Sequence, residues 1–342
     1  MTVATATKPI LSVRHLTTSF RTDDGLVTAV DDVSFEVSAG ETLGIVGESG
    51  CGKTVTSKSI MRLLPEHLTV YGDTTEVIFG GVNLIKAGEH EMRKVRGDKI
   101  AMIFQEPMTS LNPVFTIGWQ LDEALKYHTS LNKNERRDRA IEMLRLVEIP
   151  NPERRIGEYP HQLSGGMRQR AMIAMALCCE PDVLIADEPT TALDVTIQAQ
   201  ILDLMNSLKE KLSTAIMLIT HDLGVVAQVS DRVMVMYAGR AIEVGSVRDI
   251  FHCPQHPYTK ALLESIPKRG RGKTRHLPTI PGIVPSLREL PKGCRFNDRC
   301  PYSEERCVAE EPELKVHARN EQVRCHFPLN QGDCVSDKGG AS

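Results

Sequence analysis

A glycine-rich stretch, GESGCGKT at residues 47–54, most constrains what this chain can fold into. It matches the pattern G-x-x-x-x-G-K-[ST] at every fixed position, follows the apolar run TLGIV and precedes a segment with helical periodicity. Glycines let backbone N–H groups turn inward around phosphate oxygens, and the N-terminus of the following helix adds partial positive charge. The stretch therefore predicts a strand, a phosphate-binding loop and a helix in succession.

The side chains that close this loop suit a nucleotide with bound Mg²⁺. Lys53 can neutralise the β and γ phosphates, and the Thr54 hydroxyl can ligate the metal ion. The Cys51 thiol receives no role of its own, because the loop needs only its backbone. The residues predicted to surround ATP here are Gly47, Glu48, Ser49, Gly50, Cys51, Gly52, Lys53, Thr54 and Val55.

The segment DVLIADEP supplies a second half for such a site. Four apolar residues, 183–186, predict a buried strand that delivers two carboxylates at its tip. Asp187 is placed to hold Mg²⁺, and Glu188 can polarise the attacking water as a general base. Paired with the phosphate loop, these carboxylates indicate nucleotide hydrolysis rather than a plain acidic turn.

Between about residues 10 and 265, short apolar runs alternate with amphipathic helical segments. TLGIV, KIAMIF, DVLIAD and AIMLIT read as buried strands of a largely parallel sheet, whereas LSVRHLTTSF and VDDVSFEVS alternate like half-buried strands. The pattern predicts an α/β fold.

Composition excludes several classes of function. The 41 basic and 44 acidic residues leave a net charge of −3, without the basic excess typical of nucleic-acid binding. The N-terminus lacks a signal-peptide pattern, and the longest apolar runs are about half of what a bilayer crossing needs. Any role at a membrane is therefore expected to need partner chains. Nine cysteines without a secretory signal favour a reducing compartment.

Five further motifs resemble those of the ATP-binding cassette (ABC) ATPases. LSGGMRQR resembles the family's LSGGQ signature, with Met167 in place of the usual glutamine. The resemblance implies that this signature caps the γ-phosphate bound by an opposite subunit, so two such domains must face head to tail. It also implies an antiparallel β subdomain and a helical subdomain at about 110–180. The resemblance implies a role in nucleotide binding for the matching residues and, in addition, Mg²⁺ ligation by Gln105 and stacking on adenine by Phe20. The matching residues are Ser164, Gly165 and Gly166 of the signature, Gln105 of the Q-loop, Asp194 of the D-loop, the switch histidine His221, and Phe20.

A narrower resemblance, to the oligopeptide/dipeptide importer ATPases, covers nearly the whole chain. It rests on FQEPMTSLNP, YPHQLSGGM, ADEPTTALDVTIQAQIL, ITHDLGVVA, VMYAGRAIEVG and HPYTKALL. Nickel importers belong to the same group. The resemblance implies an ATP-hydrolysing translocase subunit on the cytoplasmic face of the membrane. Its implied partners are a second, related ATPase, two permease subunits and an extracytoplasmic peptide-binding protein, with no nucleic acid. An ATPase for a nickel chelate, an exporter ATPase, or a soluble ABC ATPase of DNA repair or translation are the alternatives.

The chain divides by composition after about residue 265. Residues 1–265 are expected to form the nucleotide-binding domain, 266–293 a Pro/Gly-rich connector, 294–328 a four-cysteine module and 329–342 a polar tail. The module has too little apolar sequence to fold alone, so we expect its thiols to stabilise it by cross-linking. In sequence the module lies away from the hydrolytic residues.

The cysteines of this module are spaced C-x5-C-x6-C-x17-C at Cys294, Cys300, Cys307 and Cys325. That spacing is not the paired C-x2-C of common zinc ribbons. Four thiolates suit a [4Fe–4S] cluster and also Zn²⁺. The importer resemblance favours iron–sulfur, while zinc, unligated thiols and disulfides stay open.

Overall fold

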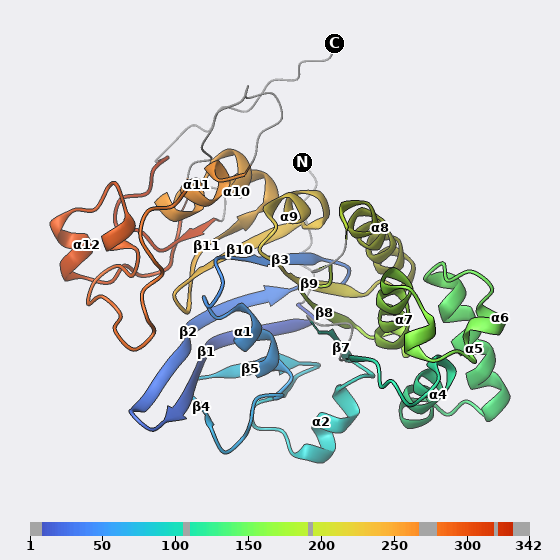
Figure 1. Ribbon diagram of the computed structural model, residues 1–342. Helices are drawn as coiled ribbons and strands as arrows, with labels where there is room; N and C mark the ends of the chain where they lie inside the picture. The colour runs from blue at the N-terminus through green and yellow to red at the C-terminus, as the bar shows by residue number, and fades with distance from the viewer. Residues whose placement is uncertain (1–8, 105–109, 191–193, 267–278, 318–320, 331–342) are drawn as a thin grey trace, which may run out of the picture.

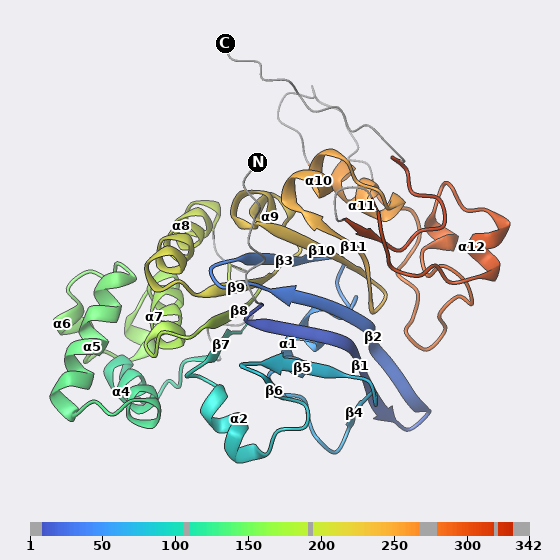
Figure 2. The ribbon, with the colours of Figure 1, turned by 180° about the vertical axis from the view of Figure 1, so that it is seen from behind.

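The computed structural model describes residues 9–104, 110–190, 194–266, 279–317 and 321–330. Two β-sheets form its centre, with helices grouped around them (Figures 1 and 2). The α/β prediction, with an antiparallel sheet and a helical part, is confirmed.

The larger sheet contains the strands that carry the nucleotide motifs. In spatial order its strands are β12 (Lys315–Val316), β13 (Gln322–Val323), β11 (Arg240–Ser246), β10 (Arg232–Tyr237), β3 (Thr42–Val46), β9 (Ala215–Ile219), β8 (Val183–Asp187) and β7 (Ile100–Ile103). The five strands from β10 to β7 are parallel. Every residue of β3, β8 and β9 is buried, as expected for continuous apolar runs covered on both faces.

The smaller sheet is antiparallel and lies against the larger one. It consists of β2 (Gly25–Val37), β1 (Leu11–Thr22), β5 (Glu76–Phe79) and β6 (Val82–Asn83), with β4 (Thr69–Tyr71) paired to β1. Apolar side chains of both sheets meet the helix α1 (Lys53–Ile60) in one core. This core fixes the position of α1, whose first residue belongs to the phosphate loop.

A second core packs several helices against strands of the larger sheet at one end of the molecule (Figure 1). Capping residues fix where two of these helices begin: Thr116 and Asn132 are their N-caps, and Glu135 completes a capping box with Asn132. The helices before the C-terminal region are α2 (Glu89–Val95), α4 (Ile117–His128), α5 (Lys133–Leu146), α6 (Pro152–Arg155), α7 (Gly165–Leu177), α8 (Val195–Leu212) and α9 (Leu223–Val229), with the 3-10 turn η1 (Pro160–Gln162).

The cysteine-containing extension lies at the opposite end of the molecule, in both ribbon views. Its strand β13 pairs with β11, and Phe296 is buried in a core shared with β10 and α11. The extension is therefore joined to the main sheet, a contact that the sequence pattern did not predict. The helical elements of the C-terminal region are α10 (Val247–His252), α11 (Pro257–Glu264), η2 (Asn297–Arg299) and α12 (Glu305–Ala309).

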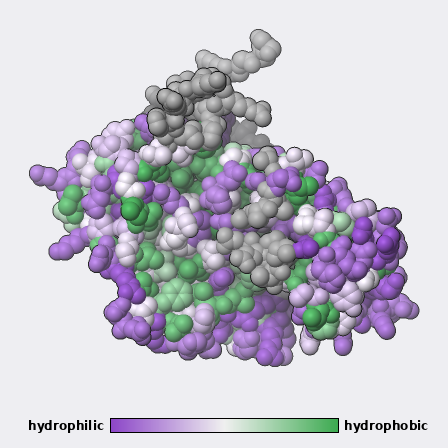
Figure 3. Space-filling view, viewed as in Figure 1, coloured by the Kyte–Doolittle hydropathy of each residue, from purple (hydrophilic) through white to green (hydrophobic). Residues whose placement is uncertain are grey.

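Surface polarity follows this arrangement. Figure 3 shows polar residues over both ends of the visible face and apolar residues gathered between them.

Within the ranges that the structure describes, no helix combines the length and the apolar character needed to cross a bilayer.

A buried carboxylate holds the start of α11 against β11. Glu243 is fully buried, and its two carboxylate oxygens accept hydrogen bonds from the backbone N–H groups of Gln255 (2.6 Å) and His256 (3.0 Å). Burial raises the pKa of Glu243 from 4.5 to about 7. The side chain that orders this turn therefore changes its charge near neutral pH.

We expect the variant Glu243→Gln to remove one component of the pH dependence of stability. Between the unfolded pKa near 4.5 and the folded pKa near 7, the native state holds a proton that the unfolded state has lost, so stability falls as pH rises. The difference in free energy of unfolding between wild type and variant should fall by about 1–3 kcal/mol from about pH 5 to about pH 8. Denaturant titrations at both pH values measure it, and parallel pH profiles of the two proteins would contradict it.

Candidate functional site

The phosphate loop connects β3 to α1, and at two of its positions only glycine fits. Gly47 has φ +154° and Gly52 has φ +103°. A Cβ atom on Gly47 would lie 2.2 Å from the carbonyl oxygen of Met236, and one on Gly52 would lie 2.7 Å from that of Ala29. Both the backbone conformation and the close approach of other strands therefore require glycine.

Lys53 turns back into the loop. Its Nζ donates hydrogen bonds to the carbonyl oxygens of Gly47 (2.7 Å) and Glu48 (3.0 Å), and only 6% of the residue is exposed. The ammonium group is thus already at the centre of the curve that the loop makes. Among the described residues no side chain caps α1, so the N–H groups of its first turn have no capping partner and can bind an anion.

The proposed magnesium residues lie together. Thr54 Oγ1 donates to Asp187 Oδ1 at 3.2 Å, and Asp187 is buried at the end of β8. Burial raises the pKa of Asp187, opposed by the hydrogen bond from Thr54. The Thr54 hydroxyl is partly buried and the Asp187 carboxylate is buried, and both are hard oxygen ligands of the kind that Mg²⁺ takes.

Glu188 and His221 face each other at the ends of neighbouring strands. His221 Nδ1 lies 3.1 Å from Glu188 Oε1, with 65% of the histidine side chain exposed and 15% of the glutamate side chain. Glu188 has φ +49°, and its N–H donates to the carbonyl of Ile219 at 2.8 Å. A left-handed residue other than glycine costs free energy, so this backbone is held by its surroundings.

The signature and D-loop residues stand at other helix N-termini. Ser164 caps α7 by accepting from the N–H of Met167, and Asp194 caps α8 by accepting from the N–H of Ile197 at 2.9 Å. Gly165 and Gly166 form the first turn of α7, and a Cβ on Gly166 would lie 3.3 Å from the Ile197 side chain. The two motifs therefore adjoin each other, with their hydrogen bonds made within their own helices.

Phe20, predicted to contact the adenine, does not belong to the phosphate loop itself. Phe20 is half-buried on β1, paired with Val27 and Thr69 of the adjacent strands. Gln105 lies outside the described residues. Of the loop, Ser49 and Gly50 are exposed, Cys51 is fully buried and Val55 is half-buried.

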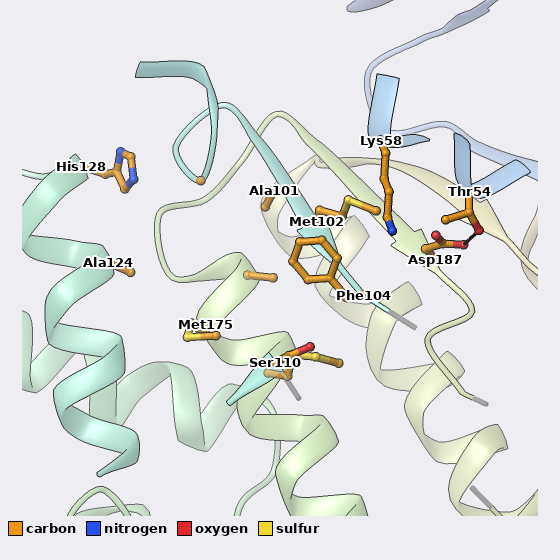
Figure 4. A pocket seen from close by; sticks show the side chains of 13 residues that line it. Thr54, Lys58, Ala101, Met102, Phe104, Ser110, Ala124, His128, Met175 and Asp187 are labelled. Carbon is orange, nitrogen blue, oxygen red and sulfur yellow. Dashed lines mark hydrogen bonds between the residues drawn. The ribbon is translucent and has the colours of Figure 1, made fainter. Parts of the chain in front are cut away.

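A cavity of about 720 Å³ opens beside the magnesium residues (Figure 4). Its polar end is formed by Thr54, Lys58 and Asp187, and its apolar end includes Phe104 and Met175. Figure 4 shows Lys58 extended from α1 toward the Asp187 side of this space. The cavity reaches from the nucleotide site to the helical part of the molecule.

The four cysteines of the extension line one small cavity together with His326. All four are free thiols. Burial raises the pKa of Cys294 to about 11 and that of Cys325 to about 12. In the part of the chain that the structure describes, no group of three or more His, Cys, Asp or Glu side chains is arranged to hold a metal ion. The iron–sulfur prediction is thus unsupported by this arrangement.

The sequence interpretation missed Arg299 and Tyr258 as neighbours of the phosphate loop. Arg299 donates to the carboxylate of Glu48, and the Tyr258 hydroxyl accepts from the N–H of Glu48. The run HPYTKALL pointed to Tyr258 only as part of a family resemblance. No signal identified Arg299, which is 251 residues from its partner.

Comparisons with known proteins agree with this geometry. Residues 30–191 match the ABC transporter family, and residues 242–307 match the oligopeptide/dipeptide transporter C-terminal region. The fold resembles the solved structure of MJ0796, a dimeric bacterial ABC transporter cassette, with a TM-score of 0.61 and 29% identity over 70% of this chain and 99% of that chain. The second matched region contains Tyr258, Arg299 and three of the four cysteines of the extension, Cys294, Cys300 and Cys307.

Two relatives align with almost the whole chain. One, "Probable peptide ABC transporter ATP-binding protein y4tR" of Sinorhizobium fredii, is 58% identical over 89% of this chain and 91% of its own. The dipeptide transport ATP-binding protein DppD of Escherichia coli is 50% identical over 94% of this chain and 97% of its own. Both regions match in order, and these relatives align over 89% and 94% of this chain, so the chain belongs to the ATP-binding proteins of the oligopeptide/dipeptide ABC transporter family.

Proposed function

We propose that this chain hydrolyses ATP to power the import of oligopeptides or dipeptides through a membrane ABC transporter. The observation that carries the proposal is the contact between Glu188 and His221 beside the Thr54–Asp187 pair, all at one edge of the parallel sheet. The names of the relatives support a peptide as the transported solute. They do not favour the nickel, exporter, DNA-repair or translation alternatives.

The residues divide the chemistry between binding and proton transfer. The loop N–H groups and Lys53 bind the phosphates, and Thr54, Asp187 and Gln105 would hold Mg²⁺, which offsets negative charge on the β and γ phosphates. Glu188 accepts a proton from the attacking water, and His221 orients the Glu188 carboxylate through their hydrogen bond. Phe20 stacks on the adenine ring.

The signature residues act on a second nucleotide. Ser164, Gly165, Gly166 and Asp194 lie at the N-termini of α7 and α8, which attract anions. Because the chain has one copy of each motif, its complete site needs a second ATPase, which we propose to be a related, non-identical chain. Two permease subunits and an extracytoplasmic peptide-binding protein complete the transporter, with this chain peripheral on the cytoplasmic face.

The same proposal includes a division of the chain. Residues 1–265 form the nucleotide-binding domain with a helical part at about 110–180, and residues 266–293 connect it to the cysteine module at 294–328. Residues 329–342 form a tail.

Replacing the general base tests the proposed hydrolysis. In the transporter reassembled with its permease, second ATPase and receptor protein, Glu188→Gln should keep ATP binding but reduce peptide-stimulated phosphate release by about 10²–10⁴-fold, because the water loses its proton acceptor. The matched control is Glu264→Gln, an exposed carboxylate of α11, which should retain wild-type turnover. Unchanged hydrolysis in Glu188→Gln would remove Glu188 from the base role. Hydrolysis that no peptide stimulates would argue for another solute.

We propose, secondly, that the four-cysteine cavity receives a metal centre, [4Fe–4S] before Zn²⁺. Four free thiols on one cavity supply the donor chemistry of either centre, although their side chains must turn toward one another to form a ligand set. A bound centre would cross-link a region that has few apolar residues of its own.

Metal analysis of the anaerobically purified full chain tests this second proposal. We expect about four iron and four sulfide per chain, with visible absorbance, and loss of both in Cys300→Ser. The control is Cys179→Ser, a thiol of the helical part, which should keep the iron. Stoichiometric zinc without iron would replace the cluster by a zinc site, and the absence of both metals would refute a metal centre.

A further inference from the structure

The C-terminal extension reaches the phosphate loop through one arginine. Arg299 Nη1 lies 2.8 Å from Glu48 Oε2, and Arg299 Nη2 lies 3.0 Å from Glu48 Oε1. This is the two-pronged geometry of an arginine with a carboxylate, which is stronger and more directional than a single charged hydrogen bond. Only 4% of the Arg299 side chain and 28% of the Glu48 side chain are exposed, so water screens the pair poorly.

Arg299 is itself held from several sides. Its Nε donates to the carbonyl of Pro281 at 2.8 Å, and its Nη1 also donates to the hydroxyl of Tyr237 at 3.2 Å. The guanidinium carbon lies 5.7 Å from the ring centre of Tyr237 and 5.9 Å from that of Phe296. An arginine fixed in this way presents its fork to Glu48 at little further entropic cost.

Tyr258 makes a second contact with the same loop residue. Its hydroxyl accepts a hydrogen bond from the Glu48 N–H at 3.0 Å, and its fully buried ring packs against Tyr237 and Phe296. Both the backbone and the side chain of Glu48 are thus bound from the C-terminal side. The contacts converge on one residue, immediately after Gly47.

The charge of Glu48 gives this contact a consequence for nucleotide binding. The carbonyl oxygens of Gly47 and Glu48 both accept from Lys53 Nζ, so the carboxylate belongs to the segment that curves around the phosphates. A carboxylate free to move there would repel a triphosphate and would compete for the Lys53 ammonium. Pairing with Arg299 neutralises that carboxylate and holds it on the side of the loop that faces the extension.

We propose that Arg299 is a positioning residue for ATP binding, acting through Glu48. The C-terminal extension then fixes the conformation of the phosphate loop by binding Glu48, in addition to any stabilising role of its cysteines. This inference rests on the proposed nucleotide site. It concerns how that site is held and assigns Arg299 no contact with the reacting atoms.

Nucleotide affinity of the full chain tests the proposal. Mg-ATP binding is measured by displacement of a fluorescent ATP analogue, together with the KM for ATP and kcat in the assembled transporter. Arg299→Gln should weaken ATP binding and raise KM by about tenfold, because it leaves the Glu48 carboxylate unpaired. The value of kcat at saturating ATP should change by less than about twofold.

A matched control distinguishes an effect on the phosphate loop from a general loss of stability. Arg324 is also buried in the C-terminal region, where it donates to the carbonyls of Ala241 and Pro312, not to the loop. Arg324→Gln should change ATP affinity by less than about twofold, even where it lowers the melting temperature as much as Arg299→Gln does.

A double variant tests whether Arg299 acts on ATP binding through Glu48. In a Glu48→Gln background no carboxylate remains to be neutralised, so adding Arg299→Gln should cost less than about twofold in affinity. Losses that simply add, or an effect of Arg299→Gln no larger than that of Arg324→Gln, would overturn the proposal. If Arg299→Gln does not fold, Arg299→Lys and Arg324→Lys replace the pair, with an expected loss of about threefold only in the former.

The wild-type protein distinguishes the two levels of inference. If wild type does not bind Mg-ATP, the proposed function itself fails. If wild type binds and Arg299→Gln binds equally well, only the role of Arg299 fails.

Discussion

The parallel pairing of β3, β8 and β9 is the constraint on which the candidate site depends. Ile219 of β9 lies in register with Asp187 of β8 on one side and with Ile45 of β3 on the other. Because parallel strands end at the same edge of a sheet, the residues that follow them meet there. The loop, the two carboxylates and His221 are thus brought together by the backbone hydrogen bonds of the sheet, whatever contacts their side chains make.

This arrangement explains why much of the site could be predicted from the sequence. Fully buried strands appear as short continuous apolar runs, and the phosphate loop, the Asp187–Glu188 pair and His221 each stand at the end of such a run. The glycine loop adds a pattern whose spacing reflects a single backbone geometry, as the close approach at Gly47 shows. Local sequence predicts this part of the site because each of these strands has its functional residues directly at its C-terminal end.

The contacts between distant segments could not be predicted in the same way. Glu48 and Arg299 are each of a type that normally faces solvent, and nothing near either one indicates the other. Their pairing depends on how the extension packs onto the main domain, with Phe296 buried in a core shared with β10 and α11, and this packing has no periodic signal. The cysteine spacing likewise identified four donors that line one cavity, but spacing does not determine how side chains are turned within it.

The pairing of β13 with β11 has a consequence for the solubility of the whole protein. An unpaired strand at the edge of a sheet exposes backbone N–H and C=O groups that can recruit another chain. Gln322 and Val323 cover this edge at Glu243 and Val244, and β12 in turn flanks β13. The extension thereby ends a large twisted sheet with two very short strands, which offer a neighbouring molecule little to pair with. A chain that ended before them would leave β11 as an open, largely apolar template for aggregation.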